Sequence, residues 1–265
     1  MGLAMEILAG FATAPGTSLT AVTMSAGLST SVRNFAESDS AALIAMWTDS
    51  QGIGQFQIRS PQFHDNVQGI NIATQISEAH PLSPWGMKQN LKPQDTPIVA
   101  ISGSNTAGDI ETGCWINFYN NLPGIAARLM NWADIKDKIE SFMISTNTLS
   151  TGTAGGFSGQ EAINAEVDNW KANRDYALLG YQCTIECAAV RWQGSDTGNL
   201  GVGGPGHELF KSLTGDWFVR LNEATGLPTI PVFNAANKSS ILIDCAQDEN
   251  GADPLVTSIF ALLAQ

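Results

Sequence analysis

The chain has 265 residues, of which 43% are hydrophobic but only 14% are charged, and its net charge is −12. A typical soluble domain has about 25% charged residues, so much of this surface must consist of neutral polar and small side chains. Such groups cost less to bury than charges, which indicates lasting contacts with other chains, although a bland secreted protein would have the same composition. No Lys/Arg cluster is present, so direct binding of nucleic acid is not expected.

The length allows one large core or two domains of about 130 residues each. The N-terminal apolar run contains Glu6 and follows no basic segment, so we expect no signal peptide. No run of 18 apolar residues exists, so no membrane-spanning helix is expected. If Cys183 and Cys187 share one strand they lie about 13 Å apart and cannot form a disulfide. With Cys114 and Cys245, they are predicted to be buried, reduced thiols.

Most predicted elements are strands, separated by clusters of Gly, Asn, Asp, Ser and Pro. In chain order the predicted strands cover 18–24, 42–48, 54–59, 69–75, 97–102, 111–119, 142–145, 177–187, 188–192, 229–233, 240–245 and 255–263.

Three helices are predicted between these strands. The first covers about 125–142, because Ile135, Ile139 and Phe142 recur at helical spacing. The second covers about 160–172, where Ser158 and Glu161 have the spacing of a capping box. The third covers about 207–224 and is expected to end at Gly226. Its apolar stripe consists of Leu209, Phe210, Leu213, Trp217 and Leu221.

Two segments of the chain are similar to each other, which predicts an internal duplication. The residues 42–45 after Asp39 match 177–180 after Asp175, and the closing segment 106–118 matches 250–262. We therefore predict an all-β fold of two tandem jelly-roll sandwiches with a few short helices. The first is assigned to residues 1–130, and the second, with the inserted helix at about 207–224, to residues 131–265.

No catalytic or cofactor motif has the context that it needs. The run 201–206 satisfies G-x-G-x-x-G, but the preceding strand ends too early and Pro205 lacks an N–H, so a glycine-rich turn is expected. His64, His80 and His207 do not form the H-x-H pattern of metal-binding bicupins, so no metal and no cofactor are predicted. Loop carboxylates leave a glycosidase pair or bound calcium open, but they are more typical of turns.

Seven tryptophans raise the alternative of an extracellular carbohydrate-binding or adhesive double β-sandwich. Trp85, between Pro84 and Gly86, is the best candidate for an exposed sugar platform. The other candidates, Trp47, Trp115, Trp192 and Trp217, lie in periodic apolar segments and are expected in the core.

Three segments carry a resemblance to a known family, namely 175–180, 196–206 and 217–234. With the duplication and the neutral surface, they resemble the second barrel of the double jelly-roll major capsid proteins of tailless icosahedral viruses, the PRD1/adenovirus-like lineage. The first half departs from this pattern, because no equivalent helix is visible there. The resemblance implies a structural protein and no enzyme.

The family further implies a homotrimer whose six jelly rolls form a pseudo-hexameric capsomer of an icosahedral shell. The chain would then be located in the virion, after assembly in the host cytoplasm. Its partners would be itself and neighbouring capsomers, and also penton or minor capsid proteins and an internal membrane.

Phe218 and Val219 are the candidate subunit-interface residues. They do not fit the apolar stripe of the third helix, because at 100° per residue they point about 100° and 200° away from Trp217. Two adjacent bulky residues off the stripe predict a second contact surface, and we expect one of them to pack against a neighbouring subunit.

Overall fold

The computed structural model describes residues 2–74, 88–163, 169–184, 187–206, 214–247, 250–251 and 253–265. These residues form four antiparallel sheets, arranged as two tandem jelly-roll sandwiches, which confirms the predicted fold class. We number the sheets 1 to 4. Sheets 1 and 2 make the first sandwich, and sheets 3 and 4 make the second.

The first sandwich is formed by the strands before residue 120. Sheet 1 has the order β3-β1-β9-β4-β7, and sheet 2 has the order β2-β8-β5-β6. The strands are β1 (Ala4–Thr13), β2 (Thr20–Ala21), β3 (Thr23–Met24), β4 (Ala41–Asp49), β5 (Gly54–Arg59), β6 (Ile70–Thr74), β7 (Gln89–Leu91), β8 (Ile98–Ile101) and β9 (Ile110–Tyr119).

The second sandwich is formed by the rest of the chain. Sheet 3 has the order β10-β16-β13-β18-β11, and sheet 4 has the order β12-β17-β14-β15. The strands are β10 (Leu129–Met130), β11 (Ile139–Thr148), β12 (Phe157–Ala162), β13 (Asp175–Cys183), β14 (Cys187–Gln193), β15 (Val202–Pro205), β16 (Ile230–Asn234), β17 (Leu242–Gln247) and β18 (Leu255–Leu263).

The two sandwiches have the same topology. Apart from the short β3 and β10, β1-β9-β4-β7 corresponds to β11-β18-β13-β16, and β2-β8-β5-β6 corresponds to β12-β17-β14-β15. The matched segments 42–45 and 177–180 even share a bulge, because the register against β9 shifts between Leu43 and Ala45, and that against β18 shifts between Leu178 and Gly180. The domain bounds at residue 130 remain a prediction.

The pairing corrects the alignment of the closing segments by one residue. Ile116 lies opposite Ala45 and Ile259 lies opposite Gly180, so Ile116 corresponds to Ile259. The sequence match had paired Ile116 with Phe260. A slip of one residue moves a side chain to the other face of a sheet, so this correction decides which faces correspond.

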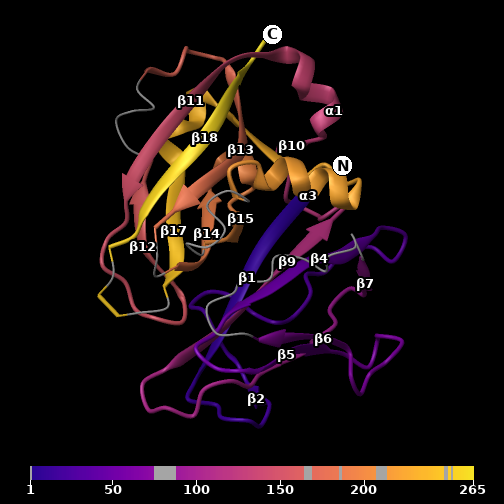
Figure 1. The fold of residues 1–265 in the computed structure, drawn as a ribbon. Helices are drawn as coiled ribbons and strands as arrows, with labels where there is room; N and C mark the ends of the chain where they lie inside the picture. The colour runs from indigo at the N-terminus through magenta and orange to yellow at the C-terminus, as the bar shows by residue number, and fades with distance from the viewer. Residues whose placement is uncertain are drawn as a thin grey trace.

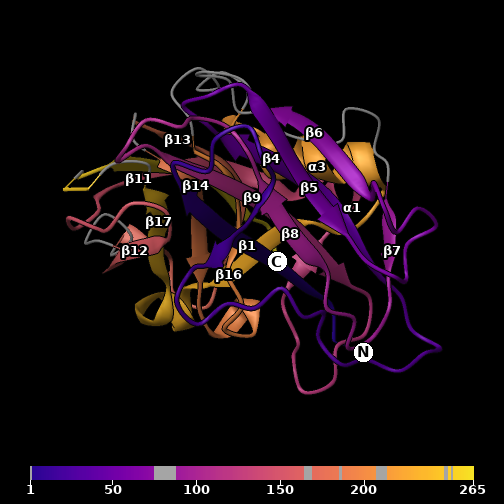
Figure 2. The ribbon, with the colours of Figure 1, turned by 90° about the horizontal axis from the view of Figure 1, so that it is seen from below.

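The sheets are stacked in the order 2, 1, 4, 3. Figure 1 shows the β5–β6 layer at the bottom, the β1–β9–β4 layer above it and the second sandwich on top, and Figure 2 shows the same layers from below. One core cluster fills the first sandwich and includes Phe56 and Trp115. A second fills the second sandwich and continues onto the outer face of sheet 1, where it includes Ile7 and Trp47.

Within the described residues, the helices are shorter than predicted. In place of a helix over 125–142, the chain has α1 (Trp132–Ile135), the 3-10 turn η1 (Lys136–Lys138) and then β11. In place of a helix that begins at residue 160, Ser158 and Glu161 lie in β12, so they form no capping box; residues 164–168 lie outside the described residues. Further 3-10 turns are η3 (Ser195–Thr197) and η5 (Ala235–Ser240).

The third predicted helix is present as α3 (Trp217–Thr225). It ends where predicted, because Gly226 takes a left-handed φ of 66° and its N–H caps the Asn222 carbonyl. The first part of the prediction, residues 207–213, lies outside the described residues. No described helix is long and apolar enough to cross a membrane.

Candidate assembly surfaces

Sheet 1 and sheet 4 form the contact between the two sandwiches. The N–H of Ile7 on β1 donates to the carbonyl of Gly201 at 2.9 Å, just before β15. The Trp47 Nε1 donates to the carbonyl of Ala188 on β14 at 2.9 Å. The Trp47 ring also meets the Trp217 ring edge-on, with centroids 6.1 Å apart. The outer face of sheet 1 is therefore buried inside the molecule.

Sheet 3 corresponds to sheet 1, but the β11 side of its outer face is open to solvent, whereas Ala177, Val232 and Ala261 on the same face are buried. Ile7 lies opposite Ile116 and Ile144 lies opposite Ile259, so Ile144 is the counterpart of Ile7, and Phe142 is the counterpart of Met5. Met5 and Ile7 are fully buried, whereas Phe142 and Ile144 are each 64% exposed. The positions that pack between the two sandwiches in sheet 1 are thus open to solvent in sheet 3.

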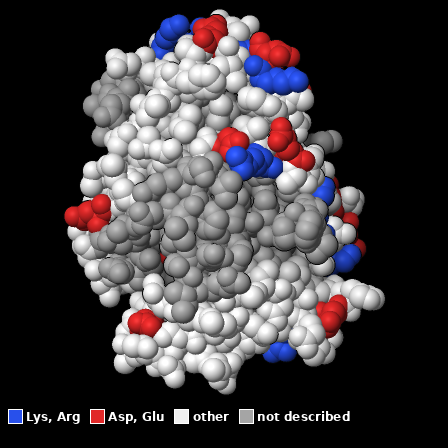
Figure 3. Space-filling model, viewed as in Figure 1, with Lys and Arg blue, Asp and Glu red and all other residues white. Residues whose placement is uncertain are grey.

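The outer face of sheet 3 is apolar and neutral around these two residues. Glu140 stands at its upper end and is bound by Arg174 at 2.7 Å. In Figure 3 the surface over β11 and β18 is largely white, and charged side chains lie mainly toward the top and the right. The face consists of Phe142, Ile144, Thr146, Leu255, Thr257 and Ile259.

Sheet 2 corresponds to sheet 4, and its outer face is also uncovered. It contains a hollow of about 370 Å³, and the apolar side chains Val67 and Ile98 on it are 64% and 47% exposed. The lining residues are Leu19, Ala21, Gln57, Arg59, Val67, Ile98 and Ala100. Exposed apolar patches of this kind mark interaction sites more often than chance surface residues do. The molecule therefore has two open apolar faces, at opposite ends of the stack of sheets.

Each of sheets 2 and 4 carries an arginine on its outer face. Arg191 on β14 makes a bidentate pair with Asp244 on β17, at 2.6 and 2.7 Å, and lies 4.1 Å from the centre of the Phe157 ring. Arg59 on β5 lies opposite Ile98, so no carboxylate faces it across the strands. Its Nε is buried without a hydrogen-bond partner among the described residues.

A half-exposed ion pair ties the connection between the sandwiches to the second one. Arg128 donates two hydrogen bonds to Asp175, at 2.9 and 2.6 Å, and Asn234 donates a third at 2.7 Å. These bonds, above all those from Arg128, lower the pKa of Asp175 below its ordinary value of 3.8. The connection is thus fixed by charge as well as by β10.

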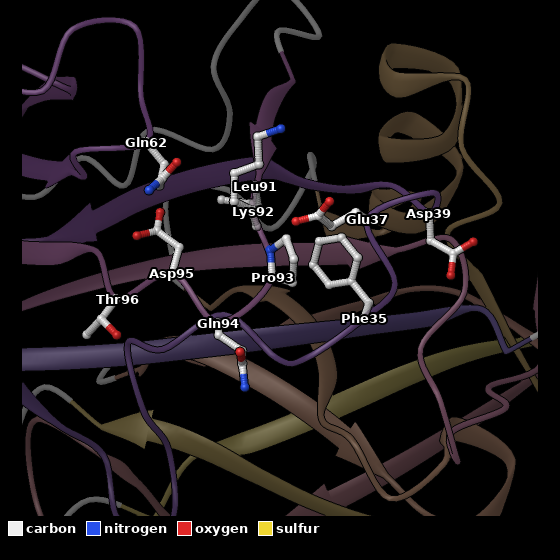
Figure 4. Close-up of a pocket in the computed structure, with 10 residues that line it drawn as sticks. All are labelled: Phe35, Glu37, Asp39, Gln62, Leu91, Lys92, Pro93, Gln94, Asp95 and Thr96. Atoms are coloured by element: carbon white, nitrogen blue, oxygen red, sulfur yellow. The ribbon is translucent and has the colours of Figure 1, made fainter.

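A hollow of about 580 Å³ lies at the loop end of the first sandwich (Figure 4). Its floor contains Phe35, which is only 6% exposed and so offers little ring surface for stacking on a sugar. Asp95 accepts a hydrogen bond from the Ser60 hydroxyl, and Asp39 accepts one from Asn121 Nδ2. Two of its carboxylates therefore already bind neighbouring loop residues.

The predicted interface residues Phe218 and Val219 are buried within the molecule. Phe218 is fully buried, and its ring lies 6.3 Å from that of Tyr181 and 6.2 Å from that of Trp192. Val219 is 9% exposed. The interface prediction for this pair was wrong, because α3 is buried over a wide face that includes Phe218 and Val219 and leaves only Arg220, Glu223 and Ala224 exposed, so a single narrow stripe does not describe it. Phe142 and Ile144 are the exposed apolar residues instead.

Other sequence motifs also have structural explanations. The glycine-rich run is strand β15 and not a turn; glycines are required there because a side chain on Gly204 would strike the Trp217 ring. Cys183 ends β13 and Cys187 begins β14, so the two are not on one strand, and their thiols meet. All four cysteines are free and buried, as predicted, and burial raises the pKa of the Cys187 thiol.

No metal centre is formed by the residues that the structure describes: no group of three or more His, Cys, Asp and Glu could hold an ion. His64 is exposed, while His80 and His207 lie outside the described residues. Trp85, the candidate sugar platform, also lies outside them. Trp47, Trp115, Trp192 and Trp217 are all buried, as predicted.

The comparisons with known proteins give only distant similarities. No family model matches the chain, and no curated protein does. Among solved structures, the chain is similar to the PBSX exported protein XepA, with 10% identity and a TM-score of 0.29 over 97% of this chain and 86% of that one. It is also similar to the major capsid protein P2 from bacteriophage PM2, with 8% identity and a TM-score of 0.20 over 99% and 98% of the two chains. At these TM-scores the likeness carries no argument about function.

Proposed function

We propose that the chain is a structural protein of a virion, a double jelly-roll major capsid protein of the PRD1/adenovirus-like type, and not an enzyme. Three copies associate head to tail into a pseudo-hexameric capsomer, and capsomers build an icosahedral shell. Neighbouring capsomers, minor or penton proteins and an internal membrane are its further partners in this proposal.

The exposure of Phe142 and Ile144 supports the proposal most directly. Their counterparts Met5 and Ile7 hold sheet 1 on sheet 4 inside the chain. The face equivalent to that of sheet 4 is on sheet 2, which is also open and carries the exposed apolar side chains Val67 and Ile98 among polar ones. Sheet 3 of one copy can therefore pack on sheet 2 of the next in the way that sheet 1 packs on sheet 4.

Such a contact joins two different faces, so it leads either to a closed ring or to an open filament. Three chains contribute six similar sandwiches, and six similar steps close a ring. Every step would bury the open faces of sheets 2 and 3, so a closed ring would expose neither of them. Few charged side chains are then needed on these faces.

The alternative, a carbohydrate-binding or adhesive protein, has no specific observation in its favour among the described residues. The hollow at the loop end of the first sandwich offers carboxylates and an almost buried Phe35, not an open aromatic platform. A monomer that binds sugars would support this alternative and contradict the capsid proposal.

The test is the mass of the purified chain in solution, measured by light scattering, with negative-stain microscopy of the same sample. We expect a discrete trimer and hexagonal particles. Phe142→Asp should give folded monomers, because a charge would be buried in the contact but is solvated in the monomer. Glu223→Gln, a change at an exposed position of α3, is the matched control and should remain trimeric. A monomeric wild-type chain would contradict the proposal.

A further inference from the structure

The edge of β1 is bound by other parts of the chain. The N–H of Ile7 faces away from β9 and donates to the Gly201 carbonyl at 2.9 Å. The carbonyl of Ala9, two residues on, accepts from the Ser25 N–H at 3.0 Å. Main-chain groups at the edge of a sheet are otherwise open to pairing with another chain. At these residues the first sandwich therefore leaves no such edge.

The edge of β11, the counterpart of β1, is open at the matching residue. The N–H of Leu149 donates to the Pro254 carbonyl, and the same register continues along both strands, so the odd-numbered residues of β11 from Met143 on bond to β18. The main-chain groups of Ile144 therefore face away from the sheet, and β11 is its edge strand. Among the described residues none forms a hydrogen bond with them.

The edge of β15 supplies the acceptor for Ile7. The N–H of Gly206 donates to the Ala188 carbonyl, so the even-numbered residues of β15 bond to β14 and the odd-numbered positions face away from it. The carbonyl of Gly201, one residue before the strand, is one of these outward groups. It accepts the hydrogen bond from Ile7 because β1 passes along this edge.

Gly69 is the counterpart of Gly201. Strands β5 and β14 end at Arg59 and Gln193, and strands β6 and β15 each begin one residue after a glycine. The register of each strand pair places Gly69 opposite Arg59 and Gly201 opposite Gln193. The two glycines therefore occupy the same place at the edge of corresponding sheets.

The carbonyl of Gly69 also points the same way as that of its counterpart. The N–H of Ser102 donates to the Gln55 carbonyl, so the odd-numbered residues of β5 bond to β8 and the even-numbered ones, including Ile58, bond to β6. Ile58 pairs with Ile70, so the Gly69 carbonyl, one residue earlier, faces away from β5. No residue within the described part of the chain donates to it.

We propose that the edge of β11 in one copy pairs with the edge of β6 in the next, through a main-chain hydrogen bond from the Ile144 N–H to the Gly69 carbonyl. These groups are the counterparts of the Ile7 and Gly201 groups that bond within the chain, so a second copy is the partner that matches both edges. Covering sheets 2 and 3 would remove both groups from water, and each then needs a partner. The inference rests on the proposed head-to-tail assembly and names the bond that fixes its register.

Hydrogen exchange, resolved to single amides by mass spectrometry, tests the bond in the unmodified chain. The Ile144 amide should exchange about a hundredfold more slowly in the trimer than in the Phe142→Asp monomer, because a bonded N–H exchanges only after the contact opens. The Ile7 amide is bonded within the chain and should be protected in both. An Ile144 amide that exchanges equally fast in trimer and monomer would overturn the inference.

Proline variants test the donor itself, with trimer dissociation measured by analytical ultracentrifugation. Ile144→Pro removes the N–H, and β11 keeps its bonds to β18 because this N–H faces away from that strand. Ile144→Ala has a smaller side chain than proline but keeps the N–H. Ile144→Pro should therefore weaken each copy–copy contact about tenfold more than Ile144→Ala does. Thr148→Pro is the matched control, because its N–H also faces away from β18 but no bond is proposed there; its trimers should be as stable as wild type.

The outcomes separate this inference from the proposed function. If Phe142→Asp is monomeric while Ile144→Pro and Ile144→Ala form equally stable trimers, the bond is wrong and the assembly stands. If wild type itself is monomeric, both are wrong. Circular dichroism should show Ile144→Pro folded; if that variant unfolds, the amide exchange of the wild-type chain decides.

Discussion

Trp47 and Gln182 occupy corresponding positions on β4 and β13, opposite Cys114 and Thr257. Trp47 is fully buried between the sandwiches, whereas Gln182 is exposed. The difference follows from the stack of sheets, since sheet 4 covers the outer face of sheet 1 at this position, whereas the corresponding position of sheet 3 is open. The exposure of the side chain at this position therefore shows whether the outer face of the sheet is covered.

Trp47→Ala should destabilise the chain by about 3 to 5 kcal/mol, because it leaves a cavity between the sandwiches and removes the partner of the Ala188 carbonyl. Gln182→Ala, at the matching position, should change the free energy of unfolding by less than about 0.5 kcal/mol in the monomer. Urea unfolding of both variants measures this. Equal effects would mean that Trp47 is not part of a packed contact.

Phe218 and Phe142 offer a second matched pair, of one residue type in opposite environments. Phe218→Ala should cost about 3 to 5 kcal/mol and give a poorly folded monomer, because the ring is packed against Tyr181 and Trp192. Phe142→Ala should leave the folding of the monomer unchanged within about 0.5 kcal/mol. Urea unfolding at a concentration where the chain is monomeric tests both. A folded Phe218→Ala monomer of unchanged stability would restore its predicted role at a subunit surface.

At the scale of the elements, the sequence analysis predicted those strands that have one solvated face or that are bounded by clear turn residues. Strands β5 and β18 have the predicted bounds, and Gly226 ends α3 as expected. Strand β1 was missed, because nearly all of its side chains are buried on both faces and a continuous apolar run has no period of two. It was visible only as an apolar N-terminal run.

The same physics explains the wrong helix at 125–142. Ile135 and Ile139 are buried or half-buried, but Phe142 and Ile144 are apolar on the outer face of β11. Apolar residues on an open face disturb the alternation of a strand and here produced helical spacing by coincidence. A face that is apolar because another chain covers it cannot be recognised from the fold of one chain alone.

The candidate surfaces were predicted only in part. Low charge indicated lasting contacts, and the match of 42–45 with 177–180 located corresponding strands. The placement of the contact on Phe218 and Val219 was wrong, because the packing around α3 depends on residues distant in sequence, including Tyr181 and Trp192. The open faces of sheets 2 and 3 become apparent only when the covered and uncovered sheets are compared.

The connection between the sandwiches depends on pH through Arg128 and Asp175. The folded state holds the pKa of Asp175 below 3.8, so the pair contributes stability above that value, and this contribution is lost as the pH falls through the lower, folded pKa. Asp175→Asn should lower stability at neutral pH and reduce the loss of stability on acidification. Denaturant midpoints between pH 3 and pH 7 test this, and parallel curves for the two proteins would contradict it.

At the scale of the whole molecule, one kind of contact accounts for the fold and, in the proposed function, for the assembly as well. Sheet 1 packs on sheet 4 within the chain, and sheets 3 and 2 are left open at the two ends of the stack. The account therefore predicts that copies join through different faces, never through the same face twice.

Disulfide crosslinking tests this claim most directly, because the four native cysteines are buried. Val67→Cys is placed in the loop before β6, beside the hollow of sheet 2, and Ile144→Cys on sheet 3. The variants are oxidised alone, mixed and combined in one chain. We expect no crosslink in either single variant, a covalent dimer in the mixture and a covalent trimer in the double variant. Self-crosslinked dimers of a single variant, or a trimer in solution with no crosslink between the two sites, would contradict head-to-tail assembly.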